Sequence, residues 1–204
     1  MSRVIFVTGI GTDVGKTVTS AILCEALHAD YWKPVQTGNY FASDAEKVKK
    51  LVSNSKTVIH PEAYSLKHHM SPHAAAETEK ITIDINKIVL PETKNTLVIE
   101  GAGGSLVPLN KTHMIIDLIK KFDCEAVVVV QNYLGSINHS LMTLECLRHR
   151  GIRIKGWILN GPGHKLSEDI ISELSQFTQL GTINKEPEVN KEMVKKYAAS
   201  FTNI

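Results

Sequence analysis

The 204-residue chain has little cysteine, no long apolar run and almost no net charge. Its three cysteines, Cys24, Cys124 and Cys146, are an odd number, and no two of them form a Cys-x-x-Cys arrangement. Cys24 and Cys146 lie within helical apolar patterns, where cysteine usually acts as a small hydrophobic residue. We therefore expect all three to be reduced and structural, which excludes a disulfide scaffold and favours a cytoplasmic protein.

The charge balance and the hydropathy exclude further classes. Lys and Arg number 23 against 21 Asp and Glu, and a formal net charge of +2 is too balanced to predict a nucleic-acid or membrane-surface partner. No apolar stretch reaches transmembrane length, and the sequence starts directly with a strand pattern, so we expect no membrane span and no signal peptide. The nine His residues lack the spacing of a zinc site.

Residues 9–17 read Gly-Ile-Gly-Thr-Asp-Val-Gly-Lys-Thr and stand between an apolar run and a helical pattern. This is the context of a phosphate-binding loop (P-loop), in which backbone N–H groups and the positive end of a helix hold a polyphosphate. We expect Lys16 to reach the β and γ phosphates and the Thr17 hydroxyl to face Mg²⁺. Five residues separate Gly9 from Gly15, where the common form has four. An ordinary glycine-rich turn would leave the Lys-Thr pair unexplained.

Short apolar runs alternate with helical patterns along the chain. Strands are predicted at 4–7, 31–35, 96–99, 126–130 and 157–159, and helices at 17–27, 43–52, 115–122, 137–149, 167–177 and 191–200. The alternation predicts an α/β fold of the P-loop NTPase type, with a mostly parallel sheet and helices on both faces. The length suits one domain spanning residues 1–204. We expect the irregular segment 54–91 to cover a site or join an interface.

Polar residues follow three of the predicted strands, where ligands of parallel sheets bind. Glu100, followed by a glycine-rich segment, suits the acidic Mg²⁺ partner of the P-loop, and a surface or helix-capping role is the alternative. Lys33 either extends to solvent or neutralises a second anion beside Lys16. Asp44 either stabilises the helix that it starts or serves as a second Mg²⁺ ligand. Asn160 is the polar residue that follows the predicted strand at 157–159.

These motifs together closely resemble the dethiobiotin synthetase family. The resemblance rests on seven segments in the family's order: residues 9–17, Lys33-Pro34-Val35-Gln36-Thr37-Gly38, Ser43-Asp44-Ala45, Ser71-Pro72-His73, Glu100-Gly101-Ala102-Gly103-Gly104, Leu134-Gly135-Ser136-Ile137-Asn138-His139 and Gly156-Trp157-Ile158-Leu159-Asn160. It implies a ligase of biotin biosynthesis that uses ATP and Mg²⁺ to carboxylate 7,8-diaminononanoate with CO₂ and to close the ring of dethiobiotin.

The resemblance also implies roles for individual residues and a homodimer. Lys16 and Lys33 would be catalytic, and Thr17, Asp44 and Glu100 would bind Mg²⁺. The diamine would contact Thr37 and, across the dimer interface, Gly135, Ser136, Ile137 and Asn138. The nucleotide would contact Thr12, Asp13, Val14, Gly15, Lys16, Thr17, Asp44, Glu100, Gly101, Ala102, Gly103, Asn160 and Gly161.

Three other functions compete with this interpretation. A switch ATPase of the ParA/MinD type would carry an additional Lys early in the loop, and residues 10–14 contain none. The nucleotide-binding half of a cobyrinate-type amidotransferase would need a glutaminase domain, for which no chain remains. The third is a nucleotide-binding scaffold without activity, against which Lys16, Lys33 and Glu100 together argue. The segments Asn160-Gly161 and 181–184 depart from the family pattern, so base selectivity stays open.

Overall fold

The computed structural model describes residues 3–38 and 43–204. Its centre is a parallel sheet of seven strands in the order β4-β2-β6-β1-β7-β8-β9. A smaller parallel sheet pairs β3 (Val35–Thr37) with β5 (Tyr64–Leu66). The strands of the main sheet are β1 (Val4–Gly9), β2 (Asp30–Trp32), β4 (Ile59–His60), β6 (Leu97–Glu100), β7 (Glu125–Val130), β8 (Ile154–Asn160) and β9 (Gln179–Ile183).

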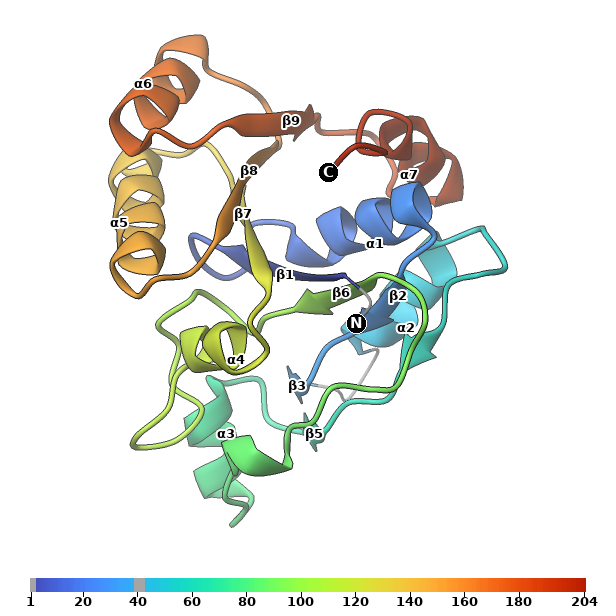
Figure 1. Cartoon of the computed structure of the whole chain (residues 1–204), viewed down its shortest axis with the longest axis vertical. Helices are drawn as coiled ribbons and strands as arrows, with labels where there is room; N and C mark the ends of the chain where they lie inside the picture. The colour runs from blue at the N-terminus through green and yellow to red at the C-terminus, as the bar shows by residue number, and fades with distance from the viewer. Residues whose placement is uncertain (1–2, 39–42) are drawn as a thin grey trace.

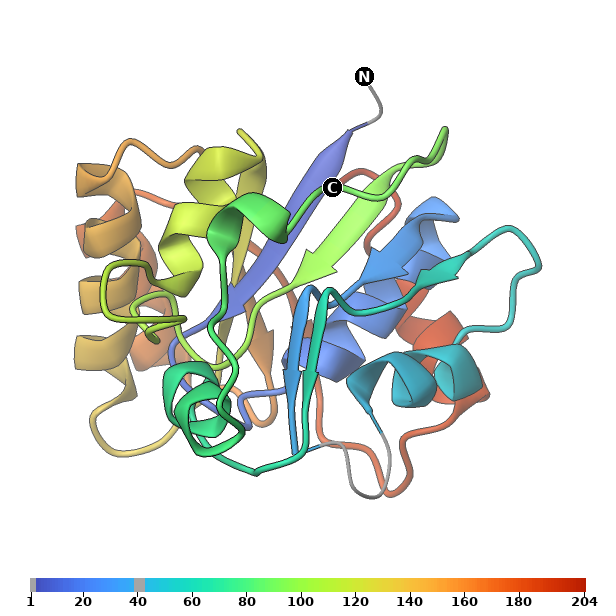
Figure 2. The same cartoon turned by 90° about the horizontal axis from the view of Figure 1, so that it is seen from below.

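Helices cover both faces of the main sheet (Figures 1 and 2). Side chains alternate along each strand, so that Ile5 and Val7 join one apolar cluster while Phe6 joins the other. The first cluster includes α1 (Lys16–Leu27), α2 (Asp44–Leu51) and α7 (Lys191–Ala198). The second includes α3 (Pro72–Thr78), the 3₁₀ helix η1 (Ile85–Lys87), α4 (Ile115–Lys121), α5 (Ser136–His149) and α6 (Lys165–Ser175). The predicted fold class is confirmed.

The predicted strand at 31–35 is wrong in one respect, because the segment is divided between the two sheets. β2 ends at Trp32, and β3 begins at Val35 beside β5. Pro34 separates them: it has no N–H to give to a sheet ladder, and its carbonyl oxygen accepts the N–H groups of Ala63 and Tyr64. The turn leaves Lys33 between the sheets, at the edge where the site lies.

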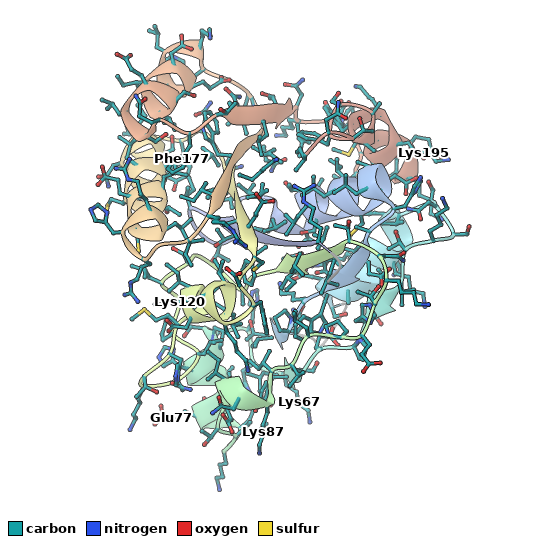
Figure 3. All side chains as sticks on the ribbon, in the orientation of Figure 1. Lys67, Glu77, Lys87, Lys120, Phe177 and Lys195 are labelled. Atoms are coloured by element: carbon teal, nitrogen blue, oxygen red, sulfur yellow. The ribbon has the colours of Figure 1, made fainter. Side chains whose placement is uncertain are left out.

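The six predicted helices are present with ends within two residues of the predicted ones. The expected irregular segment 54–91 holds β4, β5, α3 and η1, and the pattern missed β9 as well. The adjacent lysine pairs Lys49-Lys50, Lys120-Lys121 and Lys195-Lys196 lie on exposed helix surfaces, and Figure 3 shows Lys120 on α4 and Lys195 on α7. The three cysteines are free. In the described parts of the chain, no helix is long and apolar enough to cross a membrane.

Asp30 anchors the edge of the main sheet at the end opposite the site. Its buried carboxylate accepts hydrogen bonds from the hydroxyl of Thr93 at 2.6 Å, the side-chain amide of Asn95 at 2.9 Å and the backbone N–H of Val58 at 3.0 Å. The ring of His60 lies 3.0 Å from the same carboxylate. Burial acts to raise the pKa of Asp30, but these hydrogen bonds outweigh it, and the pKa is lowered.

Candidate active site

A cavity of about 660 Å³ lies where β1, β2 and β6 end. Eleven of the residues expected in the site line it, together with eight that the sequence did not indicate. The expected ones are Thr12, Asp13, Gly15, Lys16, Thr17, Lys33, Thr37, Asp44, Glu100, Ala102 and Gly103. The others are Val18, Gln36, Gly38, Lys47, Lys50, Leu51, His69 and Val189. His69 comes from the segment 54–91, part of which therefore borders the site.

The P-loop runs from β1 into α1 through two left-handed residues, Asp13 (φ 57°) and Gly15 (φ 94°). Gly15 is the N-cap of α1 and provides no side-chain cap, and the start of this helix, Gly15 to Thr17, lines the cavity. The ammonium group of Lys16 folds back and donates to the carbonyl oxygen of Gly11 at 2.7 Å. Burial lowers the pKa of Lys16 to about 8, against the raising effect of the Glu100 charge.

Lys33 is 6% exposed and lies between two carboxylates. Its ammonium group donates to Asp44 Oδ2 and lies 3.2 Å from Glu100 Oε1. Burial acts to lower the pKa of Lys33, but the two negative charges and their hydrogen bonds outweigh it, and the pKa is raised. Lys33 therefore stays charged and does not extend to solvent.

Glu100 is 1% exposed and has donors on both carboxylate oxygens. The Thr17 hydroxyl donates to Oε1 at 2.9 Å, and the Tyr31 hydroxyl donates to Oε2 at 2.8 Å. Thr17 lies in the first turn of α1 and Glu100 ends β6, so this pair joins the P-loop to the neighbouring strand. The surface alternative for Glu100 does not hold.

Asp44 is the first residue of α2 and is held from several sides. Its backbone N–H donates to Gln36 Oε1 at 3.1 Å, and its carboxylate accepts from Lys47 at 2.8 Å as well as from Lys33. Burial acts to raise the pKa of Asp44, but the Lys33 and Lys47 ammonium groups lower it to about 2. Gln36 also donates to the carbonyl oxygen of Thr37 at 2.7 Å, and so links the end of β3 to the start of α2.

The oxygen atoms around Lys33 are suited to a hard cation. Across residues 3–38 and 43–204, no group of three His, Cys, Asp or Glu side chains is placed to hold a metal ion. The converging donors are instead two carboxylates, of Asp44 and Glu100, and the Thr17 hydroxyl. Mg²⁺ is usually held by one or two carboxylates and completed by phosphate and water oxygens, so this donor set fits Mg²⁺ bound together with a nucleotide.

Several expected site residues lie outside the cavity. Val14 is buried, and a Cβ on Gly101 would lie 2.9 Å from the Phe6 ring, so both positions serve packing. The Asn160 side-chain amide, at the end of β8, donates to the Val14 carbonyl oxygen at 3.0 Å. Gly161 follows with φ 105°.

The start of α5 is also outside the cavity. Gly135 is the N-cap of α5, Ile137 and Asn138 are exposed, and Ser136 is buried. None of the four lines the cavity in the described chain. Their expected contact with substrate across a dimer interface stays a prediction.

Besides Lys47, Lys50 and His69 of the cavity lining, the sequence interpretation missed two polar groups, Tyr31 and Gln36. Both lie in the segment 31–37 with Lys33 and Thr37, and both contact a carboxylate-bearing residue of the site. Their nearness to Lys33 in sequence was a usable signal, but Tyr31 in an apolar strand resembles any core residue.

A P-loop at the carboxyl edge of a parallel sheet, facing a buried acidic residue on the adjacent strand, defines a P-loop NTPase-type fold. The fold is similar to that of the cell division ATPase MinD of Pyrococcus furiosus, with a TM-score of 0.62 at 16% identity, covering 98% of both chains. It is also similar to a ParA family ATPase from Chlorobium tepidum, with a TM-score of 0.58 at 12% identity, covering 97% of this chain and 98% of the other. At these identities, the likeness concerns the fold alone.

Sequence comparison narrows the class. A family model described as an AAA domain matches residues 3–193. The ATP-dependent dethiobiotin synthetase BioD of Christiangramia forsetii is 50% identical over 201 residues, covering 98% of this chain and 97% of the relative. That of Cytophaga hutchinsonii is 49% identical over 197 residues, covering 96% and 95%. The chain belongs to this AAA-domain family and to the family of ATP-dependent dethiobiotin synthetases.

Proposed function

We propose that this protein is a ligase that forms dethiobiotin from 7,8-diaminononanoate, CO₂ and ATP, and releases ADP and phosphate. The observation that carries the proposal is the convergence of Lys16, Lys33 and Glu100 on one cavity beside the P-loop. The ammonium groups of Lys16 and Lys33, placed beside a transferring phosphoryl group, suit a reaction in which negative charge gathers at the γ-phosphate. Family membership supports the choice of substrate.

In the proposed reaction, one amine of the diamine adds CO₂ and becomes a carbamate. The carbamate oxygen attacks the γ-phosphorus, ADP leaves, and a mixed anhydride forms. The second amine then attacks the carbonyl carbon, and phosphate leaves as the ureido ring closes. Lys16 would stabilise charge on the transferring phosphoryl group, and Lys33 would stabilise the carbamate.

Thr17, Asp44 and Glu100 would hold Mg²⁺, which when bound neutralises charge on the β and γ phosphates. The nucleotide would lie along Thr12, Asp13, Gly15 and the segment Glu100-Gly101-Ala102-Gly103. Asn160, with Gly161, would contact the base through its side-chain oxygen and its second amide N–H, since the other N–H is donated to the Val14 carbonyl oxygen. Thr37 would contact the diamine or its carbamate.

The remaining expectations complete the proposal. Residues 1–204 form a single cytoplasmic domain, and two copies form a dimer through α5 and the loop before it. The substrate's carboxylate would cross this interface to Gly135, Ser136, Ile137 and Asn138. Leu134 is fully exposed and Met142 is 62% exposed in the single chain, which is consistent with a face that the second copy covers in the dimer. A monomer by light scattering at concentrations that give full activity would contradict the dimer.

The experiment that tests the function is ATP turnover with and without diaminononanoate and bicarbonate. We expect ADP release to require both compounds and to match dethiobiotin formation in amount. A switch ATPase of the ParA/MinD type would hydrolyse ATP without responding to the diamine. ATP turnover independent of the diamine, with no dethiobiotin, would refute the proposal.

A further inference from the structure

Tyr31 is a fully buried tyrosine whose hydroxyl contacts a residue of the proposed active site from the apolar core. It is 0% exposed and belongs to the apolar cluster that includes α1 and α2. Its hydroxyl donates to Glu100 Oε2 at 2.8 Å. A buried hydroxyl costs free energy unless it finds a partner, and a phenylalanine ring would fill nearly the same space in this core without one. The hydroxyl therefore needs an explanation beyond packing.

The strand register accounts for the contact. Tyr31 on β2 stands opposite Val98 on β6, and Glu100 lies two residues further along β6. Because side chains alternate between the faces of a strand, Tyr31, Val98 and Glu100 point to the same face. The long, rigid phenol spans the diagonal between Tyr31 and Glu100, so its hydroxyl meets the carboxylate at the edge of the sheet.

The two oxygens of Glu100 consequently face different surroundings. Oε1 accepts from Thr17 and lies 3.2 Å from the Lys33 ammonium group, on the cavity side. Oε2 is held by Tyr31, the donor that the structure gives it within the described residues. Without that hydroxyl, Oε2 would lose this donor, and only the contacts of Oε1 with Thr17 and Lys33 would resist rotation of the carboxylate about its last torsion.

We infer that Tyr31 is a positioning residue for the reaction: its hydroxyl fixes the rotation of the Glu100 carboxylate and so presents one oxygen to the metal and nucleotide. This inference rests on the proposed function of Glu100 as a Mg²⁺ ligand. Tyr31 itself touches neither the cavity nor the reacting groups, since it is absent from the cavity lining.

The test is a double-mutant cycle of Tyr31→Phe and Glu100→Ala. Binding of ADP is measured by calorimetry in Mg²⁺ and in EDTA, alongside the Mg²⁺ dependence of dethiobiotin formation. A hydrogen bond to a charged group is worth about a factor of ten, so Tyr31→Phe should raise the Mg²⁺ half-saturation and weaken ADP binding in Mg²⁺ by about tenfold. ADP binding in EDTA should be unchanged. In the Glu100→Ala background, Tyr31→Phe should change neither quantity.

Tyr64→Phe is the matched control, because the Tyr64 hydroxyl accepts a hydrogen bond from the Asp84 backbone at 3.0 Å, away from the cavity. It should leave the Mg²⁺ dependence as in the wild type. Tyr31→Met also fills the core without a hydroxyl, and it replaces Tyr31→Phe if the latter does not fold. A merely structural role would lower the melting temperature of Tyr31→Phe and leave the Mg²⁺ dependence unchanged.

Two results would overturn the inference: wild-type Mg²⁺ dependence in Tyr31→Phe, or an equal loss in the Glu100→Ala background. Failure of the proposed function is separate, because it would show as a wild-type protein that forms no dethiobiotin. The ADP measurements in Mg²⁺ and EDTA would still report whether Tyr31 acts through Glu100.

Discussion

The side-chain amide of Asn160 donates a hydrogen bond to the carbonyl oxygen of Val14, 3.0 Å away, and joins the end of β8 to the P-loop. The same nitrogen lies 2.0 Å from the position that a Cβ atom on Gly15 would take, and Gly15 has φ +94°. The left-handed turn and the Asn160 contact therefore both require glycine at this position. The loop's shape depends on a residue 146 positions further along the chain.

Gly15→Ala should weaken ADP binding by at least about tenfold, because a left-handed Ala is strained by about 1–2 kcal/mol and its methyl group must displace Asn160. Calorimetry with ADP measures the change. Gly104→Ala is the control, since its Cβ would meet its nearest neighbour, Gly9, at an ordinary 3.5 Å. Equal ADP affinity in Gly15→Ala and the wild type would show that the loop tolerates a side chain.

Substitutions of Lys16 and of Lys33 should have different effects on nucleotide binding and on turnover. Lys16→Ala removes the cation of the P-loop, so both nucleotide affinity and turnover should fall, the latter by at least about 100-fold. Lys33→Gln should keep nucleotide affinity within about threefold and lose most ring formation at saturating ATP, because charge stabilisation at the reacting centre acts on kcat.

Calorimetry and dethiobiotin formation with saturating diamine separate the two lysines. Lys49→Ala is the control, since Lys49 is exposed on α2 and does not line the cavity. If Lys33→Gln lost nucleotide affinity and kept normal turnover at saturation, Lys33 would be a nucleotide ligand and the proposed division of roles would be wrong.

Glu100→Gln and Asp44→Asn should each raise the Mg²⁺ concentration for half-maximal activity by about tenfold, because an amide is a poorer ligand for a hard cation than a carboxylate. Titrating activity against Mg²⁺ tests this. Glu46→Gln, on an exposed position of α2, should leave the half-saturation unchanged. An unchanged value in both site variants would place neither carboxylate near the metal.

Asp30→Asn should lower the melting temperature at pH 7 by several degrees, because the ionised carboxylate accepts hydrogen bonds from three groups and also contacts the His60 ring. Each kcal/mol shifts the melting temperature of a chain this size by about 2–4 °C. The folded-state pKa of Asp30 is lowered, so its contribution is complete above the unfolded pKa of about 4 and is lost as the pH falls through the folded value.

Thermal unfolding at a series of pH values measures the Asp30 contribution. The gap in melting temperature between the wild type and Asp30→Asn should narrow as the pH falls below about 4. Asp169→Asn is the control, since Asp169 is half-exposed and pairs only with the exposed Lys165 in the described chain. A gap that stays constant down to pH 2 would contradict the assignment.

The local pattern of the chain predicted six of the helices and five of the seven strands of the main sheet. Apolar runs on both faces of the strands and helical periodicity between them are written into neighbouring residues, so the helix ends could be placed within two residues. Lys16, Thr17, Asp44 and Glu100 could be grouped because parallel strands end at one edge, where the following residues meet.

The contacts that refine the site came from pairings far apart in the chain. Periodicity says which face of a strand a residue occupies, but the register with the next strand decides which residue stands beside it. The diagonal placement of Tyr31 and Glu100, the division at Pro34 and the contact of Asn160 with Val14 follow from that register and from packing. The pattern of neighbouring residues in the sequence does not predict these contacts, because they form only when two distant segments meet in the folded chain.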